Sequence, residues 1–286
     1  MKRLLLLHLT KVPTDLIEYV LNHLSGSSSR KITDRTVEIL FSPPLSIDQK
    51  QNIQEQAMTF KTDTIFLKDQ FKPEQIRLLA FDMDSTLINI ECIDEIARQC
   101  GKVAEVSAIT EASMRGEIKN FSQSLLARVK LLKGVPQSDL DFVFKEKLQL
   151  NPGAKELVQF AQAMGWKTLL VSGGFTFFTN KIQELLQLDE AHSNTLEIID
   201  GYLTGNVIGP IVDGAAKAAF VLSACERLGL SPNAALVMGD GSNDLPMMEI
   251  AGLSIGYQPK PIVQEKADGT FNFVGLDGVL DVFQAP

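Results

Sequence analysis

Cysteine is scarce in this sequence, and the few positions it occupies exclude several classes of protein. The 286 residues include three cysteines, Cys92, Cys100 and Cys225, an odd number without the spacing of a metal or redox site. A disulfide framework, a structural zinc site and a dithiol redox centre are therefore not expected. We interpret the thiols as inert groups in a reducing compartment and expect a cytoplasmic protein.

Long apolar runs and excess positive charge are missing as well. The N-terminal stretch MKRLLLLHLTKV contains four leucines, but His8, Thr10 and Lys11 make its apolar run too short for a signal peptide. No later stretch has the length that a membrane helix needs. The 27 Lys and Arg residues are outnumbered by 35 Asp and Glu residues, which gives a formal charge of -8. Neither a membrane nor a nucleic acid is an expected partner, and any anionic ligand must be held by a few local cations.

Short apolar runs that end in small or acidic residues are what the sequence does have. Hydrophobic residues make up 45% of the chain, enough for a substantial core. From residue 76 onward, helical stretches separate the runs IRLLAFDMD, WKTLLVSGG, AALVMGDGSND, LSIGY and FNFV. Such runs predict an α/β fold, a Rossmann-like parallel sheet with helices on both faces and a ligand site at the carboxyl ends of its strands.

Two interruptions of this alternation divide the catalytic part, which we place at residues 73–286. Residues from about 90 to 150 contain only helical patterns, and their place after the first strand suggests a cap over the site. The stretch LEIIDGYLTGNVIGPIV alternates like a β-hairpin and has a turn signal at Asp200-Gly201.

Residues 1–72 are predicted to form a small α/β domain of their own. We expect strands at 3–9, in TVEILF and in DTIFL, helices around residues 16–24 and after Ser46, and a loop in SGSSSRK. This βαβαβ order is similar both to small amino-acid-sensing modules and to dimerisation domains. Since no glycine-rich ligand turn favours sensing, we favour structural support or dimerisation, which makes a homodimer through this domain an expectation.

Asp82 and Asp84 follow the first of the apolar runs and raise an electrostatic problem. An extended chain would place both carboxylates on one side, where they repel each other unless a cation lies nearby or one of them carries a proton. Asp240 and Asp244 follow another strand in GDGSND, and an oxygen-rich cluster of this kind suits Mg²⁺. An aspartate nucleophile beside such a metal indicates phosphoryl transfer through an aspartyl-phosphate.

Phosphoryl transfer also needs donors and a fixed cation for the oxygens of the phosphoryl group. Ser172 and the amides of Gly173 and Gly174 follow the strand WKTLLV and can donate hydrogen bonds. Lys217 lies in a helical stretch before the strand AALVMG and can supply the cation.

The order and spacing of these motifs match a known superfamily. DMDSTL, VSGGF, Lys217 and GDGSNDLPM resemble the haloacid dehalogenase-like phosphatases over about residues 76–280. DMDSTLINIECIDEIA, ITEASMRGEIKNFSQSLLARVKLLKG and LVSGGFTFFTNKI are further similar to the phosphoserine phosphatase family. The resemblance implies hydrolysis of O-phosphoserine to serine and phosphate, the last step of serine biosynthesis. Asp82 would be the nucleophile and Asp84 the general acid and base.

The resemblance also implies the ligands of each group in the site. Mg²⁺ would be held by the side chains of Asp82 and Asp240 and the carbonyl of Asp84, with Asp244 in support. The phosphate would contact Ser172, Gly173 and Lys217, and Asn243 would fix that end of the site. In the cap, Glu91 would bind the ammonium group and Arg128 the carboxylate, with Met114 and Phe121 as an apolar wall. Helical spacing independently puts Arg128 at the border of the apolar face of its helix, from where it can turn inward.

Several simpler interpretations of these residues stay open at this point. A lone pair of aspartates often only ends a strand, Glu91 is a favourable first-turn acid, and Arg128 or Lys217 can be an ordinary solvated helix charge. Two functional alternatives also stay open. The first is a phosphotransferase, or a phosphatase for another small phosphomonoester, that uses the same aspartate. The second is a regulator that binds phosphoamino acids without turnover.

Overall fold

The computed structural model describes residues 2–114 and 120–284, except for the side chains of Ser113 and Met114. One sheet of 11 strands runs through this part of the chain in the order β2-β3-β1-β4-β11-β10-β9-β5-β6-β7-β8. Its strands are β1 (Lys2–Leu7), β2 (Ser28–Lys31), β3 (Thr36–Phe41), β4 (Asp63–Leu67), β5 (Leu78–Phe81), β6 (Lys167–Phe175), β7 (Glu190–Ile199), β8 (Tyr202–Ile208), β9 (Ala235–Gly239), β10 (Leu253–Tyr257) and β11 (Gly269–Phe271).

Helices cover the sheet and form the cap. The α-helices are α1 (Thr14–His23), α2 (Ile47–Thr59), α3 (Cys92–Gln99), α4 (Val103–Met114), α5 (Phe121–Leu131), α6 (Gln137–Phe142), α7 (Ala154–Ala163), α8 (Thr176–Leu186), α9 (Gly214–Arg227), α10 (Leu245–Ile250) and α11 (Pro261–Lys266). Helical turns of the 3₁₀ or π type are η1 (Pro73–Gln75), η2 (Met83–Leu87), η3 (Val143–Lys147), η4 (Pro232–Ala234) and η5 (Leu276–Phe283). Within the described residues, no helix has the length and apolar character needed to cross a membrane.

The N-terminal segment contains one strand that the sequence does not predict. Part of SGSSSRK, expected to be a loop, forms β2, which pairs antiparallel with β3. The segment therefore has the order βαββαβ, and the expected βαβαβ order is wrong. β2 is an edge strand whose side chains are mostly exposed. It lacks the apolar alternation by which a strand is recognised, and backbone pairing with β3 determines its conformation.

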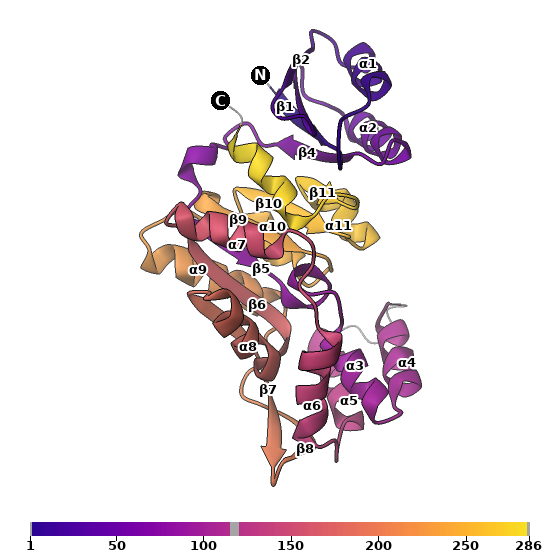
Figure 1. Ribbon diagram of the computed structural model, residues 1–286, viewed down its shortest axis with the longest axis vertical. Helices are drawn as coiled ribbons and strands as arrows, with labels where there is room; N and C mark the ends of the chain where they lie inside the picture. The colour runs from indigo at the N-terminus through magenta and orange to yellow at the C-terminus, as the bar shows by residue number, and fades with distance from the viewer. Residues whose placement is uncertain (1, 115–119, 285–286) are drawn as a thin grey trace.

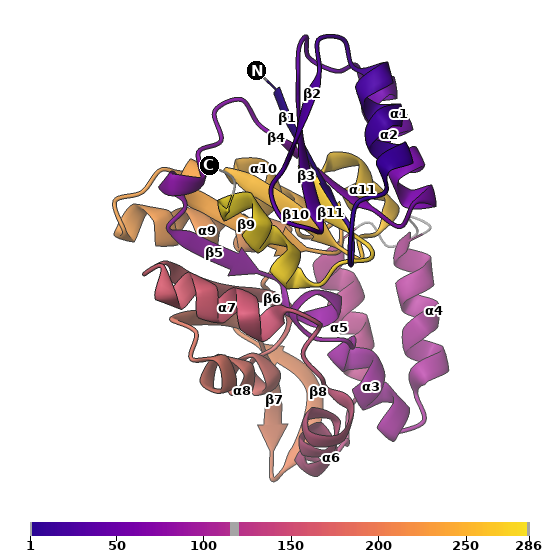
Figure 2. The ribbon, with the colours of Figure 1, turned by 45° about the horizontal axis from the view of Figure 1, so that its top comes forward.

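The N-terminal strands extend the catalytic sheet. β4 pairs antiparallel with β11, and Gly269 lies opposite Ile65. A Cβ at Gly269 would come within 2.7 Å of the Ile65 side chain, so glycine permits this close approach. Because strand residues alternate between faces, Leu4 and Leu6 pack under α1 and α2, whereas Leu5 and Leu7 join the core that includes η5. Figure 2 shows α1 and α2 together on one side of the N-terminal strands. Both faces of the N-terminal sheet are thus covered.

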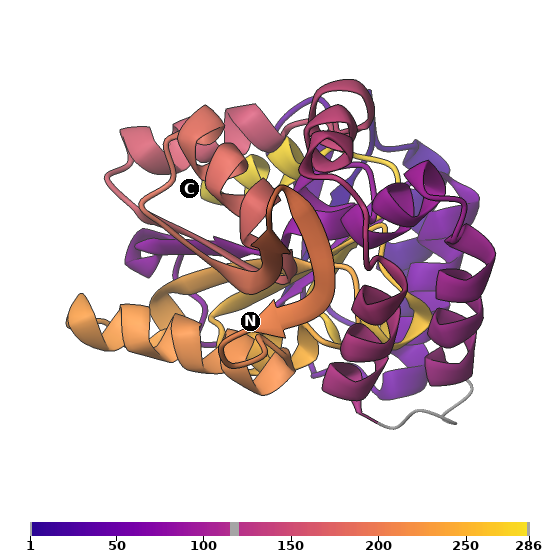
Figure 3. The same cartoon turned by 90° about the horizontal axis from the view of Figure 1, so that it is seen from below.

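The catalytic part has the predicted α/β layers. Strands β10, β9, β5, β6 and β7 pair in parallel. Helices α7 and α8 cover one face and α9 covers the other, as the view from below shows (Figure 3). The predicted hairpin is confirmed: β7 pairs antiparallel with β8, and Asp200 and Gly201 turn the chain with φ values of 52° and 81°. The strand expected in FNFV is misplaced, because β11 ends at Phe271.

The helices α3 to α6 form the cap, which lies beside the carboxyl ends of the strands (Figure 1). Its two connections to the core run next to each other, where Ile88 and Leu150 form an antiparallel bridge. The amide of Asn89 donates to the carbonyl of Gln149 at 3.0 Å in the same place. The cap also pairs with the β7–β8 hairpin, because the amide of Gly134 donates to the Leu203 carbonyl at 2.7 Å and that of Gln137 donates to the Gly201 carbonyl at 2.8 Å.

Candidate active site

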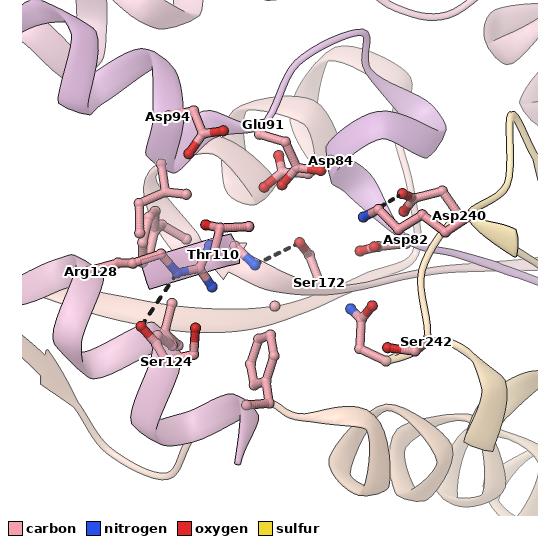
Figure 4. A pocket seen from close by; sticks show the side chains of 18 residues that line it. Asp82, Asp84, Glu91, Asp94, Thr110, Ser124, Arg128, Ser172, Asp240 and Ser242 are labelled. Atoms are coloured by element: carbon pink, nitrogen blue, oxygen red, sulfur yellow. Dashed lines mark hydrogen bonds and ion pairs between the residues drawn. The ribbon is translucent and has the colours of Figure 1, made fainter. Parts of the chain in front are cut away.

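The carboxyl ends of β5, β6 and β9 and the cap enclose one cavity of about 390 Å³. A volume of this size suits a small metabolite. Residues from both sides line it, with Asp82, Asp84 and Asp240 from the core and Glu91 and Arg128 from the cap (Figure 4). The fold therefore brings the catalytic motifs and the cap residues to a single space.

Asp82 and Asp84 reach this cavity from a tight turn. β5 ends at Phe81, and η2 begins directly after Asp82. The Asp82 Oδ1 atom accepts from the Met83 amide at 2.7 Å, and Ser85 adopts the left-handed region with φ 57°. Asp84 keeps an extended conformation, so the turn lies after it, at Ser85. Its Oδ1 atom is buried and has no hydrogen-bond partner among the described residues.

Lys217 joins two of the aspartates. Its ammonium is fully buried and lies 2.8 Å from Asp82 Oδ1 and 2.7 Å from Asp244 Oδ1. The other oxygen of Asp244 accepts from the amides of Asp240 and Gly241, each at 3.0 Å. Asp244 thus fixes both the lysine and the loop that carries Asp240.

Burial and crowding shift the titration of these carboxyls. Burial raises the pKa of Asp82 to about 7, and the charge of Asp244 adds to the rise while Lys217 opposes it. Burial likewise raises the pKa of Asp240 to about 6, against the opposing charge of Lys260. Burial and the charge of Glu91 hold the pKa of Asp84 well above its usual range. Asp84 is therefore suited to carry a proton beside an Asp82 that Lys217 helps to keep ionised.

The acidic residues offer a fitting place for a divalent cation. Asp82, Asp240 and Asp244 each provide a carboxylate oxygen, and these oxygens lie within 4.8 Å of one another. All three residues are buried, where unpaired negative charge is unfavourable, and carboxylate oxygens are the ligands that Mg²⁺ prefers. Since both oxygens of Asp244 are already engaged, Asp82 and Asp240 are the better placed of the three to bind the ion directly.

The C-terminal part of β6 faces the same acids. Ser172 is fully buried and accepts from the Gly174 amide at 2.9 Å, and Gly173 and Gly174 line the cavity. A Cβ at Gly173 would lie 2.7 Å from the Phe121 ring, and one at Gly174 would lie 3.0 Å from Asp84 Oδ2. The two glycines therefore leave room for Phe121 of the cap and for the Asp84 carboxyl. Asn243, from the loop after β9, lines the same end of the cavity.

The cap contributes a charged end to the cavity. Glu91 directly precedes α3, and its Oε1 atom accepts from Ser85 Oγ at 2.7 Å. Arg128 on α5 donates from Nε to the Ser124 carbonyl at 3.3 Å and lines the cavity, as its helical position predicts. Phe121 also lines it. The side chain of Met114, the other predicted wall residue, lies outside the described residues.

A family model described as haloacid dehalogenase-like hydrolase matches residues 76–252. The chain belongs to this hydrolase family. The matched segment runs from the start of the catalytic part through GDGSND, and it includes the whole cap and both ends of the cavity.

Individual relatives of this hydrolase carry a more specific description. A phosphoserine phosphatase of Polaromonas sp. (strain JS666 / ATCC BAA-500) is 54% identical over 215 residues, which cover 74% of this chain and 91% of the relative. A solved structure of a probable phosphoserine phosphatase from Vibrio cholerae has a TM-score of 0.80 and 35% identity, and covers 99% of this chain and 86% of its own. A phospho-aspartyl intermediate analogue of phosphoserine phosphatase has a TM-score of 0.68 and 40% identity over 72% of this chain and 98% of its own.

The sequence does not predict some of the residues that line the cavity of this hydrolase. Lys260, directly after Pro259 in the loop that follows β10, lies 3.0 Å from Asp240 Oδ2. Its place beyond a parallel strand end is the signal that could have found it. Asp94, Thr110 and Ser124 line the cap end. Asp94 follows Glu91 by three residues and lies in the first turn of α3, and both acids line the cavity.

Proposed function

We propose that this hydrolase is a Mg²⁺-dependent phosphatase that converts O-phosphoserine to serine and inorganic phosphate. The observation that carries the proposal is the cavity with two chemically different ends. Asp82, Asp84 and Lys217 supply phosphoryl-transfer groups at one end, and Glu91 and Arg128 supply opposite charges at the other. A phosphate ester that also bears an ammonium and a carboxylate complements both ends.

The first chemical step belongs to Asp82 and Asp84. A carboxylate oxygen of Asp82 attacks phosphorus while the bond from phosphorus to the seryl oxygen breaks, and Asp84 gives its proton to that oxygen. The raised pKa of Asp84 supports this assignment, because burial and Glu91 favour its protonated form. Lys217 holds Asp82 in place and adds positive charge near the phosphate. In the second step Asp84 takes a proton from water, whose oxygen attacks phosphorus and releases Asp82.

The proposed ligands follow from the same geometry. Ser172, the Gly173 amide, Lys217 and Asn243 would contact the phosphoryl oxygens. Mg²⁺ would be held by Asp82, Asp240 and the Asp84 carbonyl, with Asp244 in support. When bound, such an ion neutralises charge on the phosphoryl group and lowers the barrier to attack. Met114 and Phe121 would exclude water and longer side chains, so the cap must close for the first step and admit water for the second.

A phosphate-release assay tests the proposal. We expect phosphate release from O-phosphoserine with Mg²⁺, its loss with EDTA, and a loss of at least about a thousandfold in Asp82→Asn, which lacks the nucleophile. Transfer to homoserine in place of water would instead indicate a phosphotransferase. Binding of phosphoserine without release would indicate a regulator, and substantial turnover by Asp82→Asn would refute the mechanism.

The role of Arg128 is tested by the substrate. Arg128→Ala should lower kcat/KM for phosphoserine by about a hundredfold, because a charged hydrogen-bonded pair with the carboxylate is lost. It should spare phosphoethanolamine, which has no carboxylate. Lys130→Ala, on the same helix but exposed, is the matched control and should leave both substrates unaffected. Equal losses on both esters would contradict a role in carboxylate binding.

For residues 1–72 we propose structural support of the catalytic part of residues 73–286. The shared sheet and the covered faces support this assignment. Dimerisation through this domain stays a prediction, and it would have to use the outer sides of α1 and α2 or the β2 edge. Light scattering after size exclusion would decide between monomer and dimer. A cytoplasmic location likewise stays a prediction.

A further inference from the structure

The cap end of the cavity contains one acid more than the proposed function uses. Asp94 lies on α3 and lines the cavity beside Glu91, with Arg128 across from them (Figure 4). Its Oδ1 atom is buried and accepts no hydrogen bond from any residue that the structure describes. A buried carboxylate oxygen without a donor destabilises a fold unless a ligand supplies the donor.

The neighbouring charges do not satisfy this oxygen. Within the described ranges, neither Asp94 nor Glu91 forms an ion pair with Arg128, which donates to the Ser124 carbonyl. The guanidinium is therefore available for an anion, and the acids are available for a cation. This separation of charges inside one cavity suits a zwitterion, whose two groups would pair with opposite sides.

The number of acceptors needed by an ammonium group points to Asp94. An ammonium presents three N–H donors, and a carboxylate oxygen already engaged with another donor serves it less well. Glu91 uses Oε1 for Ser85, and its Oε2 accepts no hydrogen bond from the residues that the structure describes. Asp94 Oδ1, three residues further along the chain and in the first turn of α3, supplies a second acceptor.

We propose that Asp94 is a second acceptor for the substrate ammonium and helps to restrict this enzyme to amino-bearing phosphate esters. The proposal rests on the proposed function and adds a residue to it. Asp94 could instead have a structural role, because an acid in the first turn of α3 interacts favourably with the helix dipole. In a third role, Asp94 would orient Arg128 across the cavity. The three roles predict different dependence on the substrate.

Three esters separate these roles in Asp94→Asn, which keeps the side-chain shape and removes the charge. Phosphoserine has both the ammonium and the carboxylate, phosphoethanolamine has the ammonium alone, and the phosphate ester of hydroxypropionate has the carboxylate alone. We expect kcat/KM to fall about tenfold or more for the two amino-bearing esters, and to change less than about twofold for the hydroxypropionate ester. If turnover of an ester is too slow, its competitive inhibition constant against phosphoserine should follow the same pattern.

Glu95→Gln is the matched control, because Glu95 is the next acid of α3 and pairs with Arg98. It should behave as wild type on all three esters. Losses that follow the carboxylate, or equal losses on all three esters, would overturn the role of Asp94 as an ammonium acceptor. A melting temperature close to wild type would show that the variant is folded. If the wild type released no phosphate from phosphoserine, both the proposed function and this inference would be overturned. If the wild type is active and only the kcat/KM pattern of Asp94→Asn differs from the expected one, the inference alone is overturned.

Discussion

Lys217 shows how single residues make the site workable. The side chain is fully buried, and its ammonium neutralises part of the charge of Asp82 and Asp244. Burial alone would lower the pKa of this lysine, but the charges of Asp244 and Asp82 outweigh it and raise the pKa. The lysine is therefore charged at neutral pH, and it offsets part of the negative charge of the two aspartates.

Replacing this cation should affect both stability and activity. In Lys217→Met the buried aspartates lose their partner, so we expect a loss of about 3–5 kcal/mol in the free energy of unfolding at pH 8. Phosphate release should fall by at least about a hundredfold, because a cation beside the phosphate is lost. Urea unfolding and steady-state kinetics measure the two effects. Lys266→Met, on the short helix α11, is the control, and a stable active Lys217→Met variant would contradict the role.

The raised pKa values make stability depend on pH and metal. Asp82 and Asp240, with pKa values of about 7 and about 6, bind protons in the fold that the unfolded chain has released above about pH 4. In EDTA, this contribution to stability is complete below about pH 4 and is lost as the pH rises through 6 to 7. A bound cation should restore stability at high pH, where the carboxylates are ionised.

Thermal unfolding at two pH values measures this linkage. We expect saturating Mg²⁺ to raise the melting temperature by roughly 5–10 °C at pH 8 and by clearly less at pH 5. In Asp240→Asn, most of the Mg²⁺-dependent increase in melting temperature at pH 8 should be absent. An equal increase at both pH values, or none in the wild type, would argue against a metal site at these residues.

Single residues also show how far the sequence leads. Strand ends identify Asp82, Ser172 and Asp240 as neighbours, because parallel strands bring their carboxyl ends together. The sequence does not reveal that one oxygen of Asp244 binds Lys217 and the other binds the loop that carries Asp240, since loop geometry determines those bonds. Asp94 was missed because a first-turn acid has an ordinary explanation until the cavity around it is known.

At the scale of elements, the connection between β4 and the segment after β11 carries much of the link between the two parts. Asp63, the first residue of β4, accepts from the amides of Asn272, Phe273 and Val274 at 2.7, 3.0 and 2.9 Å. These bonds explain why the expected strand in FNFV ends early. Amides that bind a carboxylate of a neighbouring strand cannot also continue a ladder.

Removing that carboxylate should be costly. Asp63→Ala leaves three amides without their acceptor, and we expect a loss of about 3 kcal/mol or more in the free energy of unfolding. The melting temperature should fall by roughly 6–12 °C in calorimetry. Asp34→Ala, which removes an exposed acid paired with Lys31, is the control and should change the melting temperature little. A small effect of Asp63→Ala would mean that water replaces the carboxylate.

Patterns of burial explain which elements the sequence predicts. The hairpin of β7 and β8 has alternating residues and an Asp-Gly turn, and the parallel strands have continuous apolar runs, so each carries its own signal. β2 has no such sequence pattern, because an exposed edge strand is held by backbone pairing with β3 and does not require alternating apolar side chains. The joining of both parts into one sheet depends on β4 and β11 meeting, and no local pattern in the sequence specifies that pairing.

At the scale of the whole molecule, the shared sheet predicts that both parts unfold together. Leu4 is fully buried in the core that α1 and α2 cover, which contains only residues from the N-terminal part. The single tryptophan, Trp166, lies in the catalytic part and packs against Phe160 and Phe283, so its fluorescence reports on the folding of that part.

Leu4→Ala should therefore lower the melting temperature that is measured by Trp166 fluorescence, although Trp166 lies in the catalytic part. A buried Leu→Ala change costs about 2–5 kcal/mol, which corresponds to a decrease of roughly 5–15 °C in the melting temperature. We expect Trp166 fluorescence and far-ultraviolet circular dichroism to show the same decrease, because β4 and β11 make the two parts one cooperative unit. Leu9→Ala, an exposed leucine of the same segment, is the control. Two separate transitions, with the fluorescence transition unchanged, would show that the N-terminal part folds independently and supports the catalytic part only weakly.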